Sequence, residues 1–320
     1  MSAPWSSIIL DTPDPVEAWT ALFARLKETA QSTTSPVALH DATVAPDRLL
    51  SEAAWELWHR YADSAPRTSV RLKEWFNAPS SSGRAVLILD ALSLRELPLL
   101  LGAAHARGIV LKNIAVTGAE APTTTDQFAK ALGLPTRSAL QYDGKPGTFA
   151  LGNGPNVYTD VVNLPFEDCS VPPKPRVVLW HTWLDDLIHL QKRLPDQIAT
   201  LASTVLQGDG FWSFINKLRQ GRELVITADH GYAVSKRFST EETDTEAIEV
   251  LRQIFGASRC APASTAWENR FMPPVALDAN GQHVVMGQRK WKVQGGFPHV
   301  CHGGISLLEV AVPWVEIAAC

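Results

Sequence analysis

Residues 223–231 of the chain read ELVITADHG, a short apolar run followed at once by an aspartate, a histidine and a glycine. Similar runs, short and rich in Val, Ile and Leu, recur along the chain. They cover residues 85–89, 108–111 with 114–116, 176–180, 223–227 and 308–314. Amphipathic segments with helical spacing separate several of them. Continuous apolar strands alternating with helices are typical of a mostly parallel sheet buried on both faces, so we predict an α/β fold.

The first eighty residues show a different pattern. Apolar residues at helical spacing predict helices over about residues 16–30 and 48–62. The small, polar stretch of residues 77–83 interrupts this pattern. We therefore expect a helical N-terminal region, residues 1–83, and an α/β body, residues 84–320. Within the body, residues 141–174 and 232–290 are rich in Gly, Pro and polar residues, and we predict that they are insertions that decorate the sheet.

Composition excludes several classes of protein. Of the 320 residues, 45% are hydrophobic and 19% charged, which argues against a disordered chain. The net charge of −4 argues against strong binding to duplex DNA through bulk positive charge. Apolar runs stay shorter than the roughly 18 residues of a membrane helix, and a basic signal-peptide start is missing. The four scattered cysteines indicate free thiols, so we expect a cytoplasmic protein without a membrane partner.

Acidic and imidazole side chains follow the predicted strands. In open α/β sheets, ligands bind at the carboxyl ends of the strands. The residues at these positions are Asp90, then Asp185, Asp186 and His189, then Asp229 and His230, and finally His299 and His302 before the last strand. Asp185 and His189 are four apart, which puts them on one face of a helix, either as metal ligands or as a solvated polar pair. Asp90 alone fits a turn or helix-cap residue better than a ligand. Together, carboxylate oxygens and imidazole nitrogens suit Zn²⁺ or Mn²⁺.

A candidate nucleophile lies in the segment 121–127, APTTTDQ, which opens a predicted helix. Thr124 and Gln127 have the spacing of a capping box, which is the purely structural interpretation. Thr125 then lies at the helix N-terminus, where backbone dipoles favour an alkoxide and an incoming phosphate. A metal ion can activate such a hydroxyl, which is otherwise a weak nucleophile.

In this order, these residues resemble the two-metal site of the alkaline phosphatase superfamily, and within it the PglZ-domain proteins. The motifs that carry the resemblance are Asp90-Ala-Leu92, Thr227-Ala-Asp-His-Gly-Tyr232 and His302-Gly-Gly-Ile-Ser-Leu-Leu-Glu-Val-Ala-Val-Pro313. The resemblance covers about residues 84–317 and leaves the first eighty unexplained. One departure is Ser93-Leu94-Arg95, where many relatives place an arginine directly after the Asp-Ala-Leu motif.

The resemblance implies an alkaline-phosphatase-like fold and a site with two divalent metal ions, zinc or else manganese. One metal would be held by Asp185, His189 and His302, and the other by Asp90, Asp229 and His230. Asp186 is the nearest rival to Asp185, and His299 is an alternative to His302. Pro122-Thr-Thr-Thr125 resembles the superfamily's Pro-Thr-x-Thr pattern, which implies Thr125 as the nucleophile.

The resemblance also implies an activity, the hydrolysis of phosphoric esters by a phosphodiesterase or phosphatase. A nucleotide or oligonucleotide is the expected substrate, and phage defence of the BREX type, with partner proteins of that system, or signalling is the expected setting. Two alternatives stay open: a non-catalytic metal-binding subunit of a defence complex, and a phosphomutase. Candidate substrate contacts are Arg84, Lys130, Arg137 and Lys292, with Trp180 and Trp183 as possible pocket or base-stacking residues.

Overall fold

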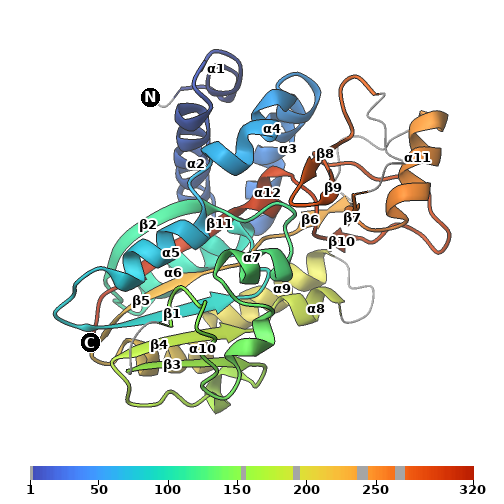
Figure 1. Ribbon diagram of the computed structural model, residues 1–320. Helices are drawn as coiled ribbons and strands as arrows, with labels where there is room; N and C mark the ends of the chain where they lie inside the picture. The colour runs from blue at the N-terminus through green and yellow to red at the C-terminus, as the bar shows by residue number, and fades with distance from the viewer. Residues whose placement is uncertain (1–2, 153–155, 190–194, 236–243, 264–270) are drawn as a thin grey trace.

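The structure is a computed structural model of the chain, and it describes residues 3–152, 156–189, 195–235, 244–263 and 271–320. Its centre is a six-stranded sheet with helices on both sides (Figure 1). The N-terminal helices lie at the top of the view, and a smaller unit built around α11 lies at the right. The expected α/β fold, a mostly parallel central sheet flanked by helices, is confirmed.

The central sheet has the strand order β2-β11-β5-β1-β4-β3. Its strands are β1 (Gly83–Leu89), β2 (Leu111–Gly118), β3 (Val157–Val162), β4 (Arg176–His181), β5 (Arg222–Thr227) and β11 (Ala311–Ile317). β1 pairs in parallel with β4 and β5, and β3 pairs in parallel with β4. β11 is antiparallel to both β2 and β5. The central strands β1, β4 and β5 are buried almost throughout, as their unbroken Val, Ile and Leu runs predict.

Two predictions about the sheet need correction. Residues 141–174 are not a mere insertion, because they contain β3, whose register runs from the Val157–Arg176 pair to the Val162–His181 pair. The predicted last strand over residues 308–314 begins too early, because α12 (Leu307–Val310) is helical and β11 starts at Ala311. The second error arises because a strand and a short helix share the same apolar composition, whereas β3 was missed because its sequence, VYTDVV, is short and partly polar.

Five helices precede the sheet: α1 (Trp5–Leu10), α2 (Pro15–Ser32), α3 (Pro36–Glu52), α4 (Trp55–Ser64) and α5 (Thr68–Asn77). α2 begins as predicted, with the Asp14 carboxylate accepting the Val16 N–H. The predicted helix over residues 48–62 is instead the end of α3 and most of α4, which meet at Ala53 and Ala54. Trp19, Trp58 and Tyr61 pack together in the core that the helices share with the sheet, with Trp19 and Tyr61 edge to face.

The change from helices to sheet falls between α5 and β1, at the polar stretch of residues 77–83. We keep residues 1–83 and 84–320 as a proposed division of the chain. The first part is packed on the second, since Trp19 and Leu22 belong to the same hydrophobic cluster as Leu87 and Leu89 of β1.

The remaining helices cover the sheet or connect its strands. They are α6 (Leu97–Ala106), α7 (Thr125–Ala131), α8 (Asp185–His189), α9 (Pro195–Gln207) and α10 (Asp209–Arg219), with short 3₁₀ turns η1 (Leu94–Glu96), η2 (Arg137–Leu140) and η3 (Phe166–Asp168). The amphipathic segment that follows β4 from Trp183 is divided between α8 and α9, and residues 190–194 lie outside the described part. None of the helices in the described ranges is long and apolar enough to span a membrane.

The predicted insertion of residues 232–290 lies outside the central sheet, at the right of Figure 1. It contains α11 (Thr245–Phe255) and a three-stranded antiparallel sheet of β7 (Cys260–Pro262), β9 (Gln282–Val285) and β8 (Ala276–Ala279). This unit has its own hydrophobic cluster, which includes Phe255, Val275 and Trp291. β6 (Ala233–Val234), before this unit, pairs antiparallel with β10 (Val300–Cys301), after it. The chain therefore enters and leaves the unit at neighbouring positions.

Candidate metal centre

The candidate site lies at the carboxyl ends of the three central strands, β5, β1 and β4. Asp90 follows β1 directly, Asp229 and His230 follow β5 after Ala228, and Asp185 begins α8 just after β4. Because β1 lies between the other two, their carboxyl ends meet at one edge of the sheet. The backbone N–H of Asp185 donates to the carbonyl of Asp90, which ties the ends of β1 and β4 together.

Asp90, Asp229 and His230 form one compact group of fully buried side chains. His230 Nε2 lies 3.4 Å from Asp229 Oδ2 and 3.9 Å from Asp90 Oδ1. One ligand atom from each residue lies within 4.8 Å of the others, a spacing that allows all three to bind a single ion. The structure thus brings together the three residues predicted for the second metal.

Asp185, His189 and His302 form the adjoining group. His189 Nε2 lies 3.2 Å from Asp185 Oδ1 and 3.1 Å from His302 Nε2, and His302 Nε2 lies 3.6 Å from Asp185 Oδ1. The four-residue spacing of Asp185 and His189 on α8 therefore has the predicted consequence. His230 is also within ligand reach of Asp185 and His302, and its ring stacks on that of His302 with centroids 4.4 Å apart. His230 thus joins the two groups into one centre.

Thr125, the first residue of α7, points into the Asp90 group. Its Oγ1 lies 3.0 Å from Asp229 Oδ2, 3.3 Å from Asp90 Oδ1 and 3.4 Å from His230 Nε2. Thr124 is the N-cap of α7, as the capping-box interpretation predicts, and accepts the Gln127 N–H. Both interpretations of this segment are therefore compatible, because they concern different threonines.

Backbone carbonyls orient two of the histidines toward the carboxylates. His230 Nδ1 lies 2.9 Å from the Gly231 carbonyl, and His302 Nδ1 lies 3.1 Å from the Thr123 carbonyl. A carbonyl only accepts, so in the neutral rings the proton is on Nδ1 and Nε2 presents a lone pair. Both lone pairs face carboxylate oxygens. Metal-binding histidines are normally oriented in this way.

Burial and crowding shift the pKa values of the site. Burial, with the Asp229 carboxylate nearby, raises the pKa of Asp90 well above its ordinary value. Burial also raises the pKa of Asp229 to about 6. Burial, together with the neighbouring His230, lowers the pKa of His302 to about 3, so this ring is neutral. The Asp90 and Asp229 carboxylates repel each other unless a proton or a cation lies between them.

The donor set fits divalent metal ions. Asp185 Oδ1 is buried without a well-directed hydrogen bond, although His189 Nε2 lies 3.2 Å away. Imidazole nitrogens and carboxylate oxygens that converge at one place are the ligands of zinc and, with more oxygen, of manganese. The residues therefore fit divalent metal ions in two overlapping groups, Asp90–Asp229–His230 and Asp185–His230–His302, with His189 beside Asp185 in the second.

The rival ligands lie elsewhere. The Asp186 side chain is exposed and accepts a hydrogen bond from Thr182 Oγ1 instead of facing the centre. His299 is exposed, and its carbonyl accepts the Ser235 N–H across the β6–β10 ladder.

Asp90 has two partners that sequence reasoning treated only as possible substrate contacts. The indole Nε1 of Trp180 donates to Asp90 Oδ2 over 3.1 Å, and the guanidinium of Arg137 binds the same oxygen. Trp180 is fully buried against Phe128 and so is not free to stack a base. Arg84, in contrast, lies at the amino end of β1 and donates to the carbonyls of Trp75 and Pro79, far from the strand ends.

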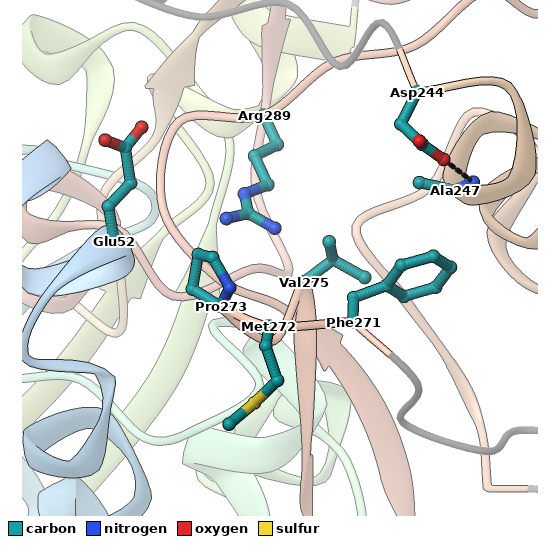
Figure 2. A pocket seen from close by; sticks show the side chains of 8 residues that line it. All are labelled: Glu52, Asp244, Ala247, Phe271, Met272, Pro273, Val275 and Arg289. Carbon is teal, nitrogen blue, oxygen red and sulfur yellow. Dashed lines mark hydrogen bonds between the residues drawn. The ribbon is translucent and has the colours of Figure 1, made fainter.

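Two cavities lie near this end of the molecule without containing the metal centre. One, of about 520 Å³, is lined by Trp183 and Asp186 together with Phe166 and Phe211. The other, of about 530 Å³, lies between α3 and the insertion. Figure 2 shows its lining side chains, including Arg289 and Glu52, and the hydrogen bond from the Ala247 N–H to the Asp244 carboxylate.

The family comparison identifies the part of the chain that carries most of this centre. The family model of the BREX system PglZ alkaline phosphatase-like domain matches residues 174–317. This segment of the chain is similar to PglZ domains. The PglZ match spans β4 to β11 and includes Asp185, His189, Asp229, His230 and His302. Asp90 and Thr125 precede it and reach the centre through β1 and α7.

Solved structures that resemble the chain share little sequence with it. Phosphonoacetate hydrolase from Sinorhizobium meliloti is 12% identical, with a TM-score of 0.42 over 75% of this chain and 90% of that one. Murine ectonucleotide pyrophosphatase/phosphodiesterase 5 is 14% identical, with a TM-score of 0.41 over 74% of this chain and 88% of that one. No curated protein matches the chain.

Proposed function

We propose that the protein is a metal-dependent phosphoric ester hydrolase, a phosphodiesterase or phosphatase, with Thr125 as its nucleophile. The observation that carries the proposal is the position of the Thr125 hydroxyl, within 3.4 Å of one side-chain atom each of Asp90, Asp229 and His230. A threonine with only a structural role in the first turn of α7 would not need to lie this close to two carboxylates and an imidazole. The alkaline phosphatase-like description of the matching family supports the same class of reaction.

Asp90, Asp229 and His230 would hold one metal ion, and Asp185, His189 and His302 the other. Bound there, the two ions would supply positive charge to stabilise the negative charge that develops in a displacement at phosphorus. Zinc is the first candidate and manganese the second, on the chemistry of the donor set.

The residues of the chain suggest how the protons and bonds move. Thr125 Oγ1 attacks phosphorus, forming an O–P bond while the bond from phosphorus to the leaving oxygen breaks. The hydroxyl proton passes to the acidic and imidazole groups around it, nearest of which is Asp229 Oδ2 at 3.0 Å. A water oxygen then bonds to phosphorus while the bond from phosphorus to Thr125 Oγ1 breaks, and a proton of the water returns to Thr125 Oγ1. The N-terminal turn of α7 favours the negative charge in both steps.

Arg137 is the best candidate for a substrate contact among the four basic residues considered. Its guanidinium reaches Asp90 at the centre while its side chain keeps 28% exposure. Once a cation binds Asp90, this guanidinium can turn to an oxygen of the phosphoryl group, with which it forms charge-assisted hydrogen bonds. A nucleotide or oligonucleotide is the proposed substrate, and a role in phage defence is the proposed setting, since the family description names the BREX system.

The test is the hydrolysis of bis-p-nitrophenyl phosphate and p-nitrophenyl phosphate with Zn²⁺, with Mn²⁺ and with a chelator. We expect metal-stimulated turnover of at least one ester. Thr125→Ala should lose most of it, at least 100-fold, while Thr124→Ala, which removes only the N-cap of α7, retains it.

Each outcome discriminates. Metal-stimulated turnover that survives in Thr125→Ala would remove Thr125 as nucleophile but leave a metal hydrolase. Metal binding without turnover of either ester would favour the non-catalytic subunit. Transfer of the phosphoryl group to a second hydroxyl of the same substrate would favour the phosphomutase.

A further inference from the structure

Glu309 and Arg259 form a fully buried ion pair, and neither residue belongs to the proposed ligand groups. Both oxygens of the Glu309 carboxylate accept from the guanidinium, Oε1 from Nε and Oε2 from Nη2, each over 2.9 Å. A bidentate pair of this kind is directionally specific. A buried pair adds little net stability compared with apolar residues, so its geometry is the more informative property.

The Glu309 carboxylate holds the loop that carries His302. The N–H of Gly304 donates to Glu309 Oε1 over 3.1 Å. Thr123 Oγ1 accepts the N–H of Gly303 and donates to the carbonyl of Gly304. The carbonyl of the same Thr123 accepts from His302 Nδ1. Orientation of the His302 ring therefore depends on a loop that is anchored to Glu309.

The main chain of Glu309 also reaches the second histidine loop. Its carbonyl accepts the N–H of Gly231 over 2.8 Å, and the carbonyl of Gly231 accepts from His230 Nδ1. Glu309 thus contacts both loops, the His302 loop through its side chain and the His230 loop through its backbone. Substitution of the side chain should disturb the first loop and spare the second.

Arg259 connects this anchor to the insertion. It lies just before β7, its carbonyl accepts the Val285 N–H of β9, and its guanidinium donates to the carbonyls of Gly287 and Arg289. The guanidinium also lies directly against Gly304, where a Cβ would come within 2.5 Å of Nε. Arg289 in turn lines the cavity between α3 and the insertion (Figure 2).

We propose that the Arg259–Glu309 pair is a positioning device that sets the metal affinity of the Asp185–His189–His302 group and couples this group to the insertion. Neither residue touches the metal positions; they act through Gly304 and His302. Partners that orient a ligand histidine typically change metal affinity 10- to 100-fold when they are replaced. The inference rests on the proposed two-metal centre.

The test is a zinc titration of the metal-free protein in competition with a chromophoric chelator. Wild type should take up zinc in two steps, and Asp185→Asn identifies the step that belongs to the His302 group. Glu309→Gln and Arg259→Lys should weaken that step about 10- to 100-fold and leave the other unchanged. The matched control is Arg222→Lys. Arg222 is a buried arginine at the amino end of β5, away from the candidate centre, and it donates to three backbone carbonyls.

The outcomes separate this inference from the proposed function. A wild type that takes up no zinc overturns both. Two normal steps in folded Glu309→Gln and Arg259→Lys overturn the positioning role alone, as does a shift of both steps equal to that in Arg222→Lys. Should Glu309→Gln fail to fold, Arg259→Lys, which keeps the buried positive charge, decides the matter. Zinc should also slow amide exchange at Gly287 of the wild type, and unchanged exchange there would contradict the coupling.

Discussion

Thr123, Thr124 and Thr125 are chemically identical neighbours that their surroundings divide into three roles. Thr125 faces the carboxylates of the centre, and Thr124 caps α7. Thr123, fully buried, bridges the two glycines after His302 with its hydroxyl. A one-residue shift of the chain would exchange these roles, so the position of α7 relative to β1 determines which hydroxyl is available for chemistry.

At the residue scale, we predict that Thr123→Val destabilises the protein by about 1–3 kcal/mol, because the N–H of Gly303 and the carbonyl of Gly304 lose a buried partner. Val has nearly the same volume, so packing contributes little. The measurement is the free energy of unfolding in urea. Thr123→Ser, which keeps the hydroxyl, is the control and should lose less than half as much. Equal losses in the two variants would show that the methyl group, not the hydroxyl, matters.

At the scale of elements, α3 is docked on α12 through a buried carboxyl group. Asp47 Oδ1 accepts the Leu307 N–H over 3.1 Å, and Asp47 is fully buried. Burial raises its pKa to about 7, with the Glu309 carboxylate adding to the rise and Arg259 opposing it. The N-terminal helices are therefore bound to the histidine loops by an interaction whose charge changes near neutral pH.

The sign of the resulting pH dependence follows from the raised pKa. Asp47 titrates near pH 4 in the unfolded chain and near pH 7 in the folded protein, so the folded state binds more protons between these values. Its contribution to stability is present below about pH 4 and is lost as the pH rises through 7. Asp47→Asn keeps an acceptor for Leu307 and cannot ionise.

We therefore predict that Asp47→Asn gains stability relative to wild type as the pH rises from 5 to 8, by on the order of 2 kcal/mol. Chemical denaturation of both proteins at the two pH values measures this difference. Asp41→Asn, on the same helix but exposed, is the control and should follow the wild type. A difference between Asp47→Asn and wild type that does not change with pH would show that Asp47 is ionised throughout this range.

At the scale of the whole molecule, the metal centre draws on segments spread along the chain. Asp90 follows β1, Asp185 and His189 are on α8, Asp229 and His230 follow β5, and His302 comes after the insertion. In the unfolded chain these proposed ligand groups come from distant segments, so a metal that they hold would bind the folded state preferentially. Such binding stabilises the fold by mass action, by about 4 kcal/mol per site at a free metal concentration a thousand times the Kd.

We predict that zinc raises the melting temperature of the metal-free protein by several degrees, as expected for a stabilisation of this size in a chain of this length. Thermal unfolding followed by circular dichroism, with zinc or with a chelator, measures the effect. Asp229→Asn should lose a large part of it. Asp186→Asn, beside a proposed ligand but outside the centre, should retain it. No zinc-dependent shift in the wild type would argue against a metal centre in this protein.

Local sequence pattern determined much of this protein. The apolar runs of β1, β4 and β5 predicted the core of the sheet, because a strand buried on both faces must be apolar throughout. The residues directly after those strands predicted the candidate centre, because parallel strands bring their carboxyl ends to one edge. Asp185 and His189 paired as their spacing predicts, because one helical turn aligns them.

Only the tertiary structure decided the rest. The place of β3 at the edge of the sheet, the position of His230 between the two ligand groups and the contact of Glu309 with both histidine loops depend on residues distant in sequence. Local patterns report which face of an element is apolar, not which element packs against it. Strand pairing and side-chain burial depend on contacts between residues that are distant in sequence, so these features follow from the assembled fold.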